Sequence, residues 1–166
     1  PLTFAISGTG SAGMEAGLCN LLEPDDTILI GVNGFFGERI AEISRRQGAK
    51  VIRVDTEWGL PLNPDEIEQE LKRHPEVKAL AVVHAETSTG VLQPLEDLSS
   101  LAKRYDTLFL VDAVTSLGGS PIPVETLGID FCYSATQKCI GAPPGLSPVT
   151  ASERARETMA NRKDSP

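Results

Sequence analysis

Short runs of apolar residues alternate with stretches of helical periodicity along the whole chain. Several of the runs are almost continuously apolar, which is typical of strands buried on both faces of a sheet. These runs predict strands over residues 2–6, 27–32, 50–54, 79–84, 107–112, 130–133 and 146–150.

One helical stretch carries clear start signals. Asn63 is a favourable N-cap residue, Pro64 suits the first helical position, and Glu66 completes a capping-box spacing. Ile67 and Leu71 then fall four residues apart on one helical face. We therefore expect a helix that begins at Pro64 with Asn63 as its N-cap.

Four more helices are expected from the same periodicity. Gly48 follows the second of them and predicts the left-handed residue that ends many helices. Their apolar stripes are Met14, Leu18, Leu21 and Leu22; Phe36, Ile40 and Ile43; and Leu95, Leu98, Leu101, Ala102 and Tyr105; the last helix, over residues 152–161, is mostly polar.

Strands that alternate with helices favour an α/β fold, here a three-layer, doubly wound and mostly parallel sheet of seven strands. No internal linker, repeat or low-complexity stretch divides the chain, so we expect residues 1–166 to form a single domain. In such sheets ligands bind at the carboxyl ends of the strands. Polar residues directly after each strand are therefore the candidates for a site.

Composition narrows the class of partner. Lys plus Arg number 15 and Asp plus Glu number 23, and the net charge of −8 argues against a nucleic acid or an anionic membrane. No apolar run approaches the roughly 18 residues of a membrane span. Three cysteines are too few for a disulfide scaffold, so we expect a reducing, cytoplasmic compartment. The chain opens Pro1-Leu2 without a signal peptide, as if it began inside a longer protein.

A glycine-rich segment follows the first expected strand. Gly8, Gly10 and Gly13 let the backbone approach an anion, and the helix that they lead into supplies free N–H groups. The same spacing fits a dinucleotide fingerprint, which needs an acidic residue roughly 20 residues further on. Asn33 and Gly34 follow the second strand instead, without a carboxylate. The segment therefore favours a phosphate site over NAD; a turn that only permits close helix–strand packing is the structural alternative.

Two further candidates stand at the ends of later strands. Asp112 closes an apolar strand, where it could serve a ligand, cap a helix or form a structural ion pair. A magnesium-dependent phosphate site lacks support, because the chain contains no P-loop motif. Lys138 follows the strand at 130–133 among small and apolar neighbours. Most lysines are solvated surface charges, but a buried amine there could have a lowered pKa and act as a nucleophile.

A third pattern, His84-Ala85-Glu86, invites comparison with zinc deaminases. Their signature also requires Pro-Cys-x-x-Cys, and Cys132 and Cys139 lack that spacing. We therefore expect no metal site, and we interpret His84 as a strand-end residue beside a pocket.

A glycine-rich helix start, a strand-end carboxylate and a strand-end lysine together suggest pyridoxal phosphate as the cofactor. The Lys138 amine can form a Schiff base with the aldehyde, and Asp112 can keep the ring nitrogen protonated. The helix N-terminus can bind the phosphate. Phe36 or Phe35, in the loop after the second strand, can cover one face of the ring.

Five segments of the chain stand in the order found in one known family. They are SGTGS at 7–11, NGFFGER at 33–39, HAETSTG at 84–90, VDAVTSLGG at 111–119 and SATQK at 134–138. In these segments the chain resembles the class V aminotransferases of fold type I, and within them the alanine–glyoxylate (serine–pyruvate) group. The resemblance extends over nearly all 166 residues.

The resemblance implies a role for each candidate residue. Lys138 is the Schiff-base lysine and the proton shuttle, and Asp112 is the partner of the pyridinium nitrogen. Where Phe36 stacks on the ring the closest relatives carry Trp, and at the position of Ser11 they often carry His or Thr. The residues implied to bind the cofactor are Thr9, Gly10, Ser11, Phe36, Thr87, Asp112, Gln137 and Lys138.

The resemblance also implies an activity and partners. It indicates transamination from a small amino acid, alanine or serine, to an oxo acid, glyoxylate or pyruvate, in a homodimer with shared active sites. This chain would be the cofactor-binding large domain, without the N-terminal segment or the C-terminal small domain that holds the arginine for the substrate carboxylate.

Four alternatives remain beside this interpretation. A 2-aminoethylphosphonate transaminase belongs to the same family, and so does a cysteine desulfurase, whose relatives carry His over the ring where this chain has Phe36. A NAD-binding module and a catalytically silent domain belong to other classes. Lys138 and Asp112 argue against a silent domain, which needs neither.

Overall fold

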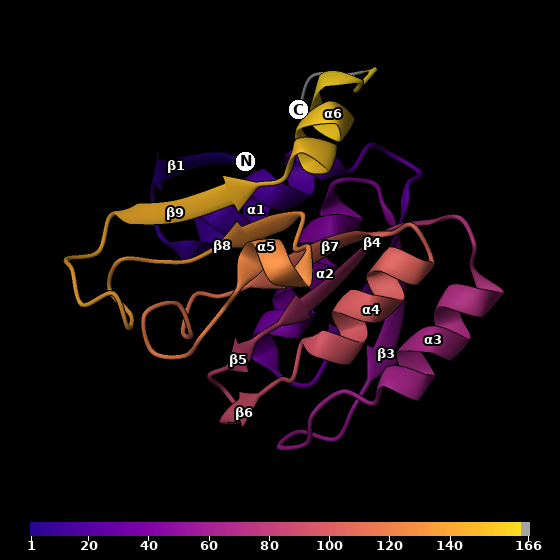
Figure 1. Ribbon diagram of the computed structural model, residues 1–166, viewed down its shortest axis with the longest axis horizontal. Coiled ribbons are helices and arrows are strands. Elements are labelled where there is room, and N and C mark those ends of the chain that lie inside the picture. Colours follow the sequence, from indigo (N-terminus) through magenta and orange to yellow (C-terminus); the bar gives the residue numbers. More distant parts are fainter. Residues whose placement is uncertain (164–166) are drawn as a thin grey trace.

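A seven-stranded sheet forms the centre of the computed structural model, which describes residues 1–163 (Figure 1). Its strand order is β1-β9-β8-β7-β4-β2-β3. The strands are β1 (Leu2–Ser7), β2 (Thr27–Val32), β3 (Lys50–Asp55), β4 (Val77–Val83), β7 (Leu108–Asp112), β8 (Phe131–Tyr133) and β9 (Leu146–Ala151). All the strands expected from the apolar runs are therefore confirmed, with ends that differ by at most two residues.

The sheet is mostly parallel, as expected. The four pairs among β8, β7, β4, β2 and β3 are parallel, whereas β9 runs antiparallel to both of its neighbours, β1 and β8. The carboxyl ends of β1, β2, β3, β4, β7 and β8 therefore meet at one edge. The segments that follow these strands carry the candidate site residues.

Helices cover both faces of the sheet and form the three expected layers (Figure 1). The apolar residues of the two faces make separate cores, one under each set of helices. The helices of one face are α1 (Gly10–Leu21), α2 (Phe35–Arg46) and α6 (Glu153–Ala160), and those of the other are α3 (Pro64–Arg73), α4 (Glu96–Arg104) and α5 (Val124–Leu127).

The N-cap at Asn63, the helix start at Pro64 and the turn at Gly48 are confirmed, whereas Glu66 makes no capping-box bond among the described residues. The Asn63 side chain accepts a hydrogen bond of 3.0 Å from the N–H of Asp65, and Pro64 opens α3. Gly48 follows α2 with a φ of +84°, a conformation that favours glycine. The short hairpin of β5 (Ala85–Glu86) and β6 (Val91–Leu92), and the single turn of α5, were not expected, because such short elements carry no periodicity.

Glycine lets α1 pack directly on the sheet. A Cβ atom at Gly13 would lie 2.2 Å from Ser147 Oγ and 2.9 Å from Tyr133 Cβ, and both of these residues are buried.

Alanine at an open helical site would stabilise the fold by about 0.5–1 kcal/mol. At Gly13 we expect the opposite sign, a destabilisation of about 1–3 kcal/mol from overpacking. Urea midpoints of Gly13→Ala would measure it, with Glu15→Ala on the exposed side of α1 as control; an unchanged or higher midpoint for Gly13→Ala would contradict the close packing.

None of the helices described within residues 1–163 is long and apolar enough to cross a lipid bilayer.

Candidate active site

A cavity of about 290 Å³ opens at the edge where the parallel strands end. The segments that form it follow β1, β2, β7 and β8, so residues more than 120 positions apart in the chain meet there. Its lining residues are Thr9, Gly10, Ser11, Met14, Phe36, Asp112, Val114, Gln137 and Lys138. Of the eight residues that the family resemblance implies for cofactor binding, all except Thr87 line this cavity.

The N-terminus of α1 forms one wall. Thr9 is the N-cap residue in extended conformation, but its side chain makes no capping hydrogen bond, and the first turn carries no acidic residue. The N–H groups of Gly10 and Ser11 belong to that first turn. An uncapped helix start with a positive dipole end suits an anion such as a phosphate.

Gly10 brings this helix start close to the other strand ends. A Cβ atom there would lie 2.6 Å from Val114 Cγ2 and 3.3 Å from Ala135 Cβ. The N–H of Gly8 donates a hydrogen bond of 2.8 Å to the carbonyl of Gly145, in the loop after β8. The glycines therefore serve close packing, as the structural alternative held, and that packing places the helix start beside Asp112 and Lys138.

Asp112 is a buried carboxylate at the end of β7. Its Oδ1 accepts a hydrogen bond of 2.8 Å from the N–H of Val114, and its Oδ2 accepts one of 2.8 Å from the Tyr133 hydroxyl. Burial raises the pKa of Asp112 to about 6, although both of these hydrogen bonds lower it; the Glu86 carboxylate adds a small upward effect. The carboxylate lines the cavity, where a cationic group of a ligand could approach it.

Tyr133 was not identified from the sequence. It is fully buried at the end of β8, and burial together with the Asp112 carboxylate raises the pKa of its hydroxyl. Asp112 and Tyr133 are paired in the register of β7 and β8, so their side chains leave the sheet on the same side. Aligning the last residues of two neighbouring parallel strands could have found this contact.

Lys138 stands in the turn after β8 and is exposed, so the buried amine that its neighbours suggested is wrong for this structure. Backbone hydrogen bonds hold the turn in place, among them one of 2.9 Å from the N–H of Gly141 to the carbonyl of Lys138. The Thr136 hydroxyl donates to the Pro143 carbonyl at 2.6 Å, and the Cys139 thiol donates to the Thr115 carbonyl at 3.1 Å. The lysine backbone is therefore held while its side chain is left free to move.

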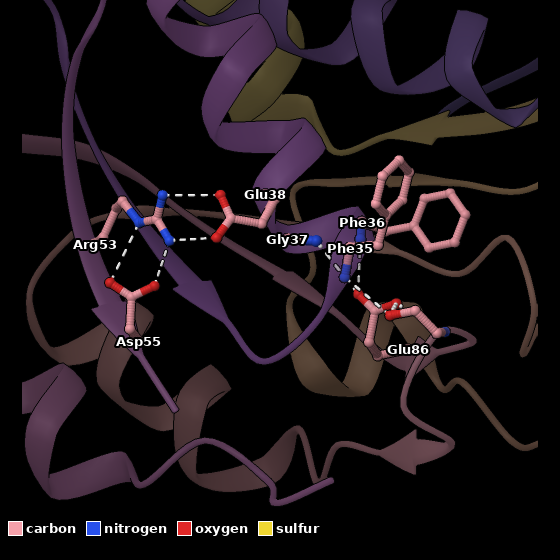
Figure 2. A network of polar contacts seen from close by, with 8 residues as sticks. Phe35, Phe36, Gly37, Glu38, Arg53, Asp55 and Glu86 are labelled. Carbon is pink, nitrogen blue, oxygen red and sulfur yellow. Dashed lines mark hydrogen bonds and ion pairs between the residues drawn. The ribbon is translucent and has the colours of Figure 1, made fainter. Parts of the chain in front are cut away.

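Phe36 supplies the aromatic wall of the cavity. It is half-buried in the first turn of α2, whereas Phe35 is 56% exposed and does not line the cavity. The two rings meet edge to face, with centroids 5.4 Å apart (Figure 2). Of the two aromatic residues proposed from the sequence, the structure brings Phe36 to the site.

Thr87 and His84 lie outside this cavity. Thr87 is exposed, and its hydroxyl is 2.6 Å from that of Thr115. His84 is buried and lines a different cavity, of about 370 Å³; its Nδ1 is 2.9 Å from Ser116 Oγ, and burial lowers its pKa. Among residues 1–163, no group of three or more His, Cys, Asp or Glu side chains is arranged to hold a metal ion.

The cavity thus brings together an uncapped helix start, a buried carboxylate, an aromatic ring and an exposed lysine. These are the groups that a pyridoxal phosphate enzyme requires. The chain belongs to the aminotransferase class-V family, whose pattern matches residues 3–164. Members of this family depend on pyridoxal phosphate.

Relatives of known name match all or nearly all of the chain. It is 45% identical over 166 residues to the alanine–glyoxylate aminotransferase of Rattus norvegicus, and 41% identical over 160 residues to the (S)-ureidoglycine–glyoxylate transaminase of Bacillus subtilis. These matches cover 100% and 96% of this chain but 40% and 38% of the relatives. The crystal structure of the alanine–glyoxylate aminotransferase of Nostoc sp. superposes with a TM-score of 0.95 at 48% identity, over 99% of this chain and 43% of that one. The chain thus spans about two fifths of the length of the relatives that it matches.

Proposed function

We propose that the protein is a pyridoxal phosphate-dependent transaminase that moves an amino group from alanine or serine to glyoxylate or pyruvate. The observation that carries the proposal is the meeting of the α1 N-terminus, Asp112 and Lys138 around one cavity. Both named relatives use glyoxylate by their names, which supports this acceptor. Their donors differ, so (S)-ureidoglycine is a second candidate donor.

The residues present fit the cofactor. The first turn of α1, with Thr9, Gly10 and Ser11, would hold the phosphate, and Gln137 lines the cavity beside them. Phe36 would lie against one face of the ring. Asp112 would meet the ring nitrogen, because within residues 1–163 its buried carboxylate accepts two hydrogen bonds but forms no ion pair, which leaves it a suitable partner for a positive group. We leave Thr87 out of this set, since its side chain lies outside the cavity.

Bound in this cavity, the cofactor would supply an electron sink for the charge that develops when the Cα–H bond of an amino acid breaks. Asp112 would hold a proton on the ring nitrogen, and it does so best when ionised, above its pKa of about 6. Lys138 would anchor the aldehyde covalently and, once released by the substrate, move the proton from Cα as general base and then acid. Its exposed, unrestrained side chain suits a group that must change partners.

The proposal also concerns parts of the enzyme that lie outside this chain. We propose that residues 1–166 act as the cofactor-binding domain and that a further domain supplies the arginine for the substrate carboxylate. A homodimer with active sites at its interface completes the proposal.

The complete protein tests the cofactor directly. With pyridoxal phosphate added, we expect an absorption band at about 410–430 nm, in the range of the protein-bound imine of this cofactor. Borohydride should then fix the cofactor on Lys138, which peptide mapping by mass spectrometry would locate. A colourless protein in excess cofactor, or label on another lysine, would overturn the proposal. Assays of alanine, serine and (S)-ureidoglycine against glyoxylate and pyruvate would separate the donors.

A further inference from the structure

Glu86 is a buried carboxylate that the proposed chemistry does not use. It is 1% exposed, in the hairpin that follows β4. One oxygen, Oε2, accepts hydrogen bonds from the N–H groups of Phe36 and Gly37 at 3.0 and 3.3 Å. The other, Oε1, accepts from the N–H and the hydroxyl of Ser88 at 3.1 and 2.7 Å. Figure 2 shows the Glu86 carboxylate directed at the first turn of α2.

Ser88 completes the same contact. Its Oγ accepts a hydrogen bond of 2.9 Å from the N–H of Phe35. The N–H of Glu38 bonds to the Gly34 carbonyl within the helix. The free amides at the start of α2 are therefore satisfied by a hairpin about fifty residues further along the chain, rather than by a local cap.

The sequence around Gly34 favours this remote cap over a local one. Gly34 is the N-cap residue of α2 and offers no side chain, where Ser, Thr, Asp or Asn would be the common solution. A Cβ atom at Gly34 would lie 2.3 Å from Glu86 Cγ. A local capping side chain and the Glu86 carboxylate therefore exclude each other at this position.

The amide that Glu86 holds belongs to the aromatic wall of the cavity. Phe36 is bound by its backbone N–H to Glu86 while its ring lines the cavity that contains Asp112 and Lys138. Rotation or fraying of the first turn of α2 would move this ring. Anchoring the turn to the hairpin therefore fixes the ring relative to the ends of the strands.

We propose that Glu86 is a positioning residue: by capping α2 from the hairpin, its carboxylate holds the Phe36 ring in place for stacking on the cofactor. The inference rests on the proposed function, because it needs a planar ligand in the cavity. It goes beyond that function in assigning a role to a residue that does not line the cavity.

A double-mutant cycle on cofactor affinity tests the inference in the complete protein. Phe36→Ala should weaken pyridoxal phosphate binding by roughly 5- to 10-fold through loss of ring stacking. Glu86→Ala should weaken binding by a similar factor when Phe36 is present. In the Phe36→Ala background the same change should have little further effect, because the residue through which it acts is gone. Glu86→Gln, which keeps one carbonyl oxygen for the α2 amides, should recover part of the affinity.

Arg53→Ala is the matched control. Arg53 pairs with Glu38 at 2.6 Å and with Asp55, so this cluster also braces the first turn of α2, but through the Glu38 side chain and not through the amides of Phe36 and Gly37 (Figure 2). Its removal should leave cofactor affinity within about twofold of the parent protein. Effects of Glu86→Ala and Phe36→Ala that multiply independently would overturn the inference and leave the proposed function standing.

Hydrogen exchange of the cofactor-free protein separates the two proposals. Glu86→Ala should speed exchange of the Phe36 and Gly37 amides, while Arg53→Ala should leave them protected. Unchanged protection in Glu86→Ala would show that the cap does not hold the helix start, and would overturn the inference. A parent protein that fails to bind pyridoxal phosphate would overturn the proposed function, while the exchange data would still decide whether Glu86 fixes the turn.

Discussion

Replacing Lys138 by alanine should abolish transamination while leaving the fold intact. The amine would no longer be present to anchor the cofactor or to move the Cα proton, and proton transfer by a positioned group alone contributes about 10²- to 10⁴-fold to the rate. We therefore expect kcat/KM for alanine and glyoxylate to fall by at least about 10³-fold. Because Lys138 is exposed in a turn, the free energy of unfolding should change by no more than about 0.5 kcal/mol.

Controls make this result specific. Lys72→Ala removes another exposed lysine, on α3 and outside the cavity, and should leave kcat/KM unchanged. A small primary amine added to Lys138→Ala should restore part of the activity, since it can take over the proton transfer. Activity of Lys138→Ala within tenfold of the parent protein would be incompatible with the assigned role.

Asp112→Asn should separate activity from stability, which makes it the second large effect. An asparagine keeps the size of the side chain and its bond from the Val114 N–H, but it cannot neutralise a protonated ring nitrogen. Loss of a preorganised charge at the reacting centre costs about 10²- to 10³-fold, and we expect kcat to fall by that factor. The covalent link to Lys138 should persist, so the absorption band should remain.

In the cofactor-free protein the same substitution should raise stability above neutral pH. Burial raises the pKa of Asp112 from 3.8 to about 6, so the fold favours the protonated form. The stability from this preference is fully present below pH 3.8 and is lost as pH rises through about 6. The shift corresponds to about 3 kcal/mol.

Urea unfolding at pH 4 and pH 8 would measure this effect. The cofactor-free Asp112→Asn protein should gain up to about 3 kcal/mol over the parent protein at pH 8 and much less at pH 4. Added pyridoxal phosphate should narrow the difference at pH 8, because its cationic ring would compensate the buried carboxylate. A gain of equal size at both pH values would mean that the burial of charge at Asp112 is not the cause.

The strands, and the meeting of the candidate site residues at one edge of the sheet, could be predicted from the sequence for related physical reasons. β2, β4 and β7 are buried on both faces, so their apolar runs are unambiguous. Parallel strands share a carboxyl edge, which is why Asp112 and the turn of Lys138 meet the start of α1.

What escaped prediction depends on contacts between segments far apart in the chain. Tyr133 becomes a partner of Asp112 only through the register of β7 and β8, and Glu86 becomes a helix cap only when its hairpin meets α2. The direction of Thr87 is set within the same hairpin, whose two-residue strands carry no pattern. The exposure of Lys138 likewise follows from the fold of its turn rather than from its apolar neighbours.

The antiparallel strand β9 affects the order in which parts of the sheet can form during biosynthesis. β1 has β9 as its neighbour in the sheet, with Leu2 opposite Ala151, so β1 must wait for a strand that is synthesised much later. At typical translation rates that wait lasts roughly 10 to 30 s. β2, β3, β4 and β7 can assemble in the meantime from segments closer in the chain. Because α1 continues from β1 and packs on β8 and β9, we expect the cavity wall formed by the start of α1 to be completed only after these late strands are present.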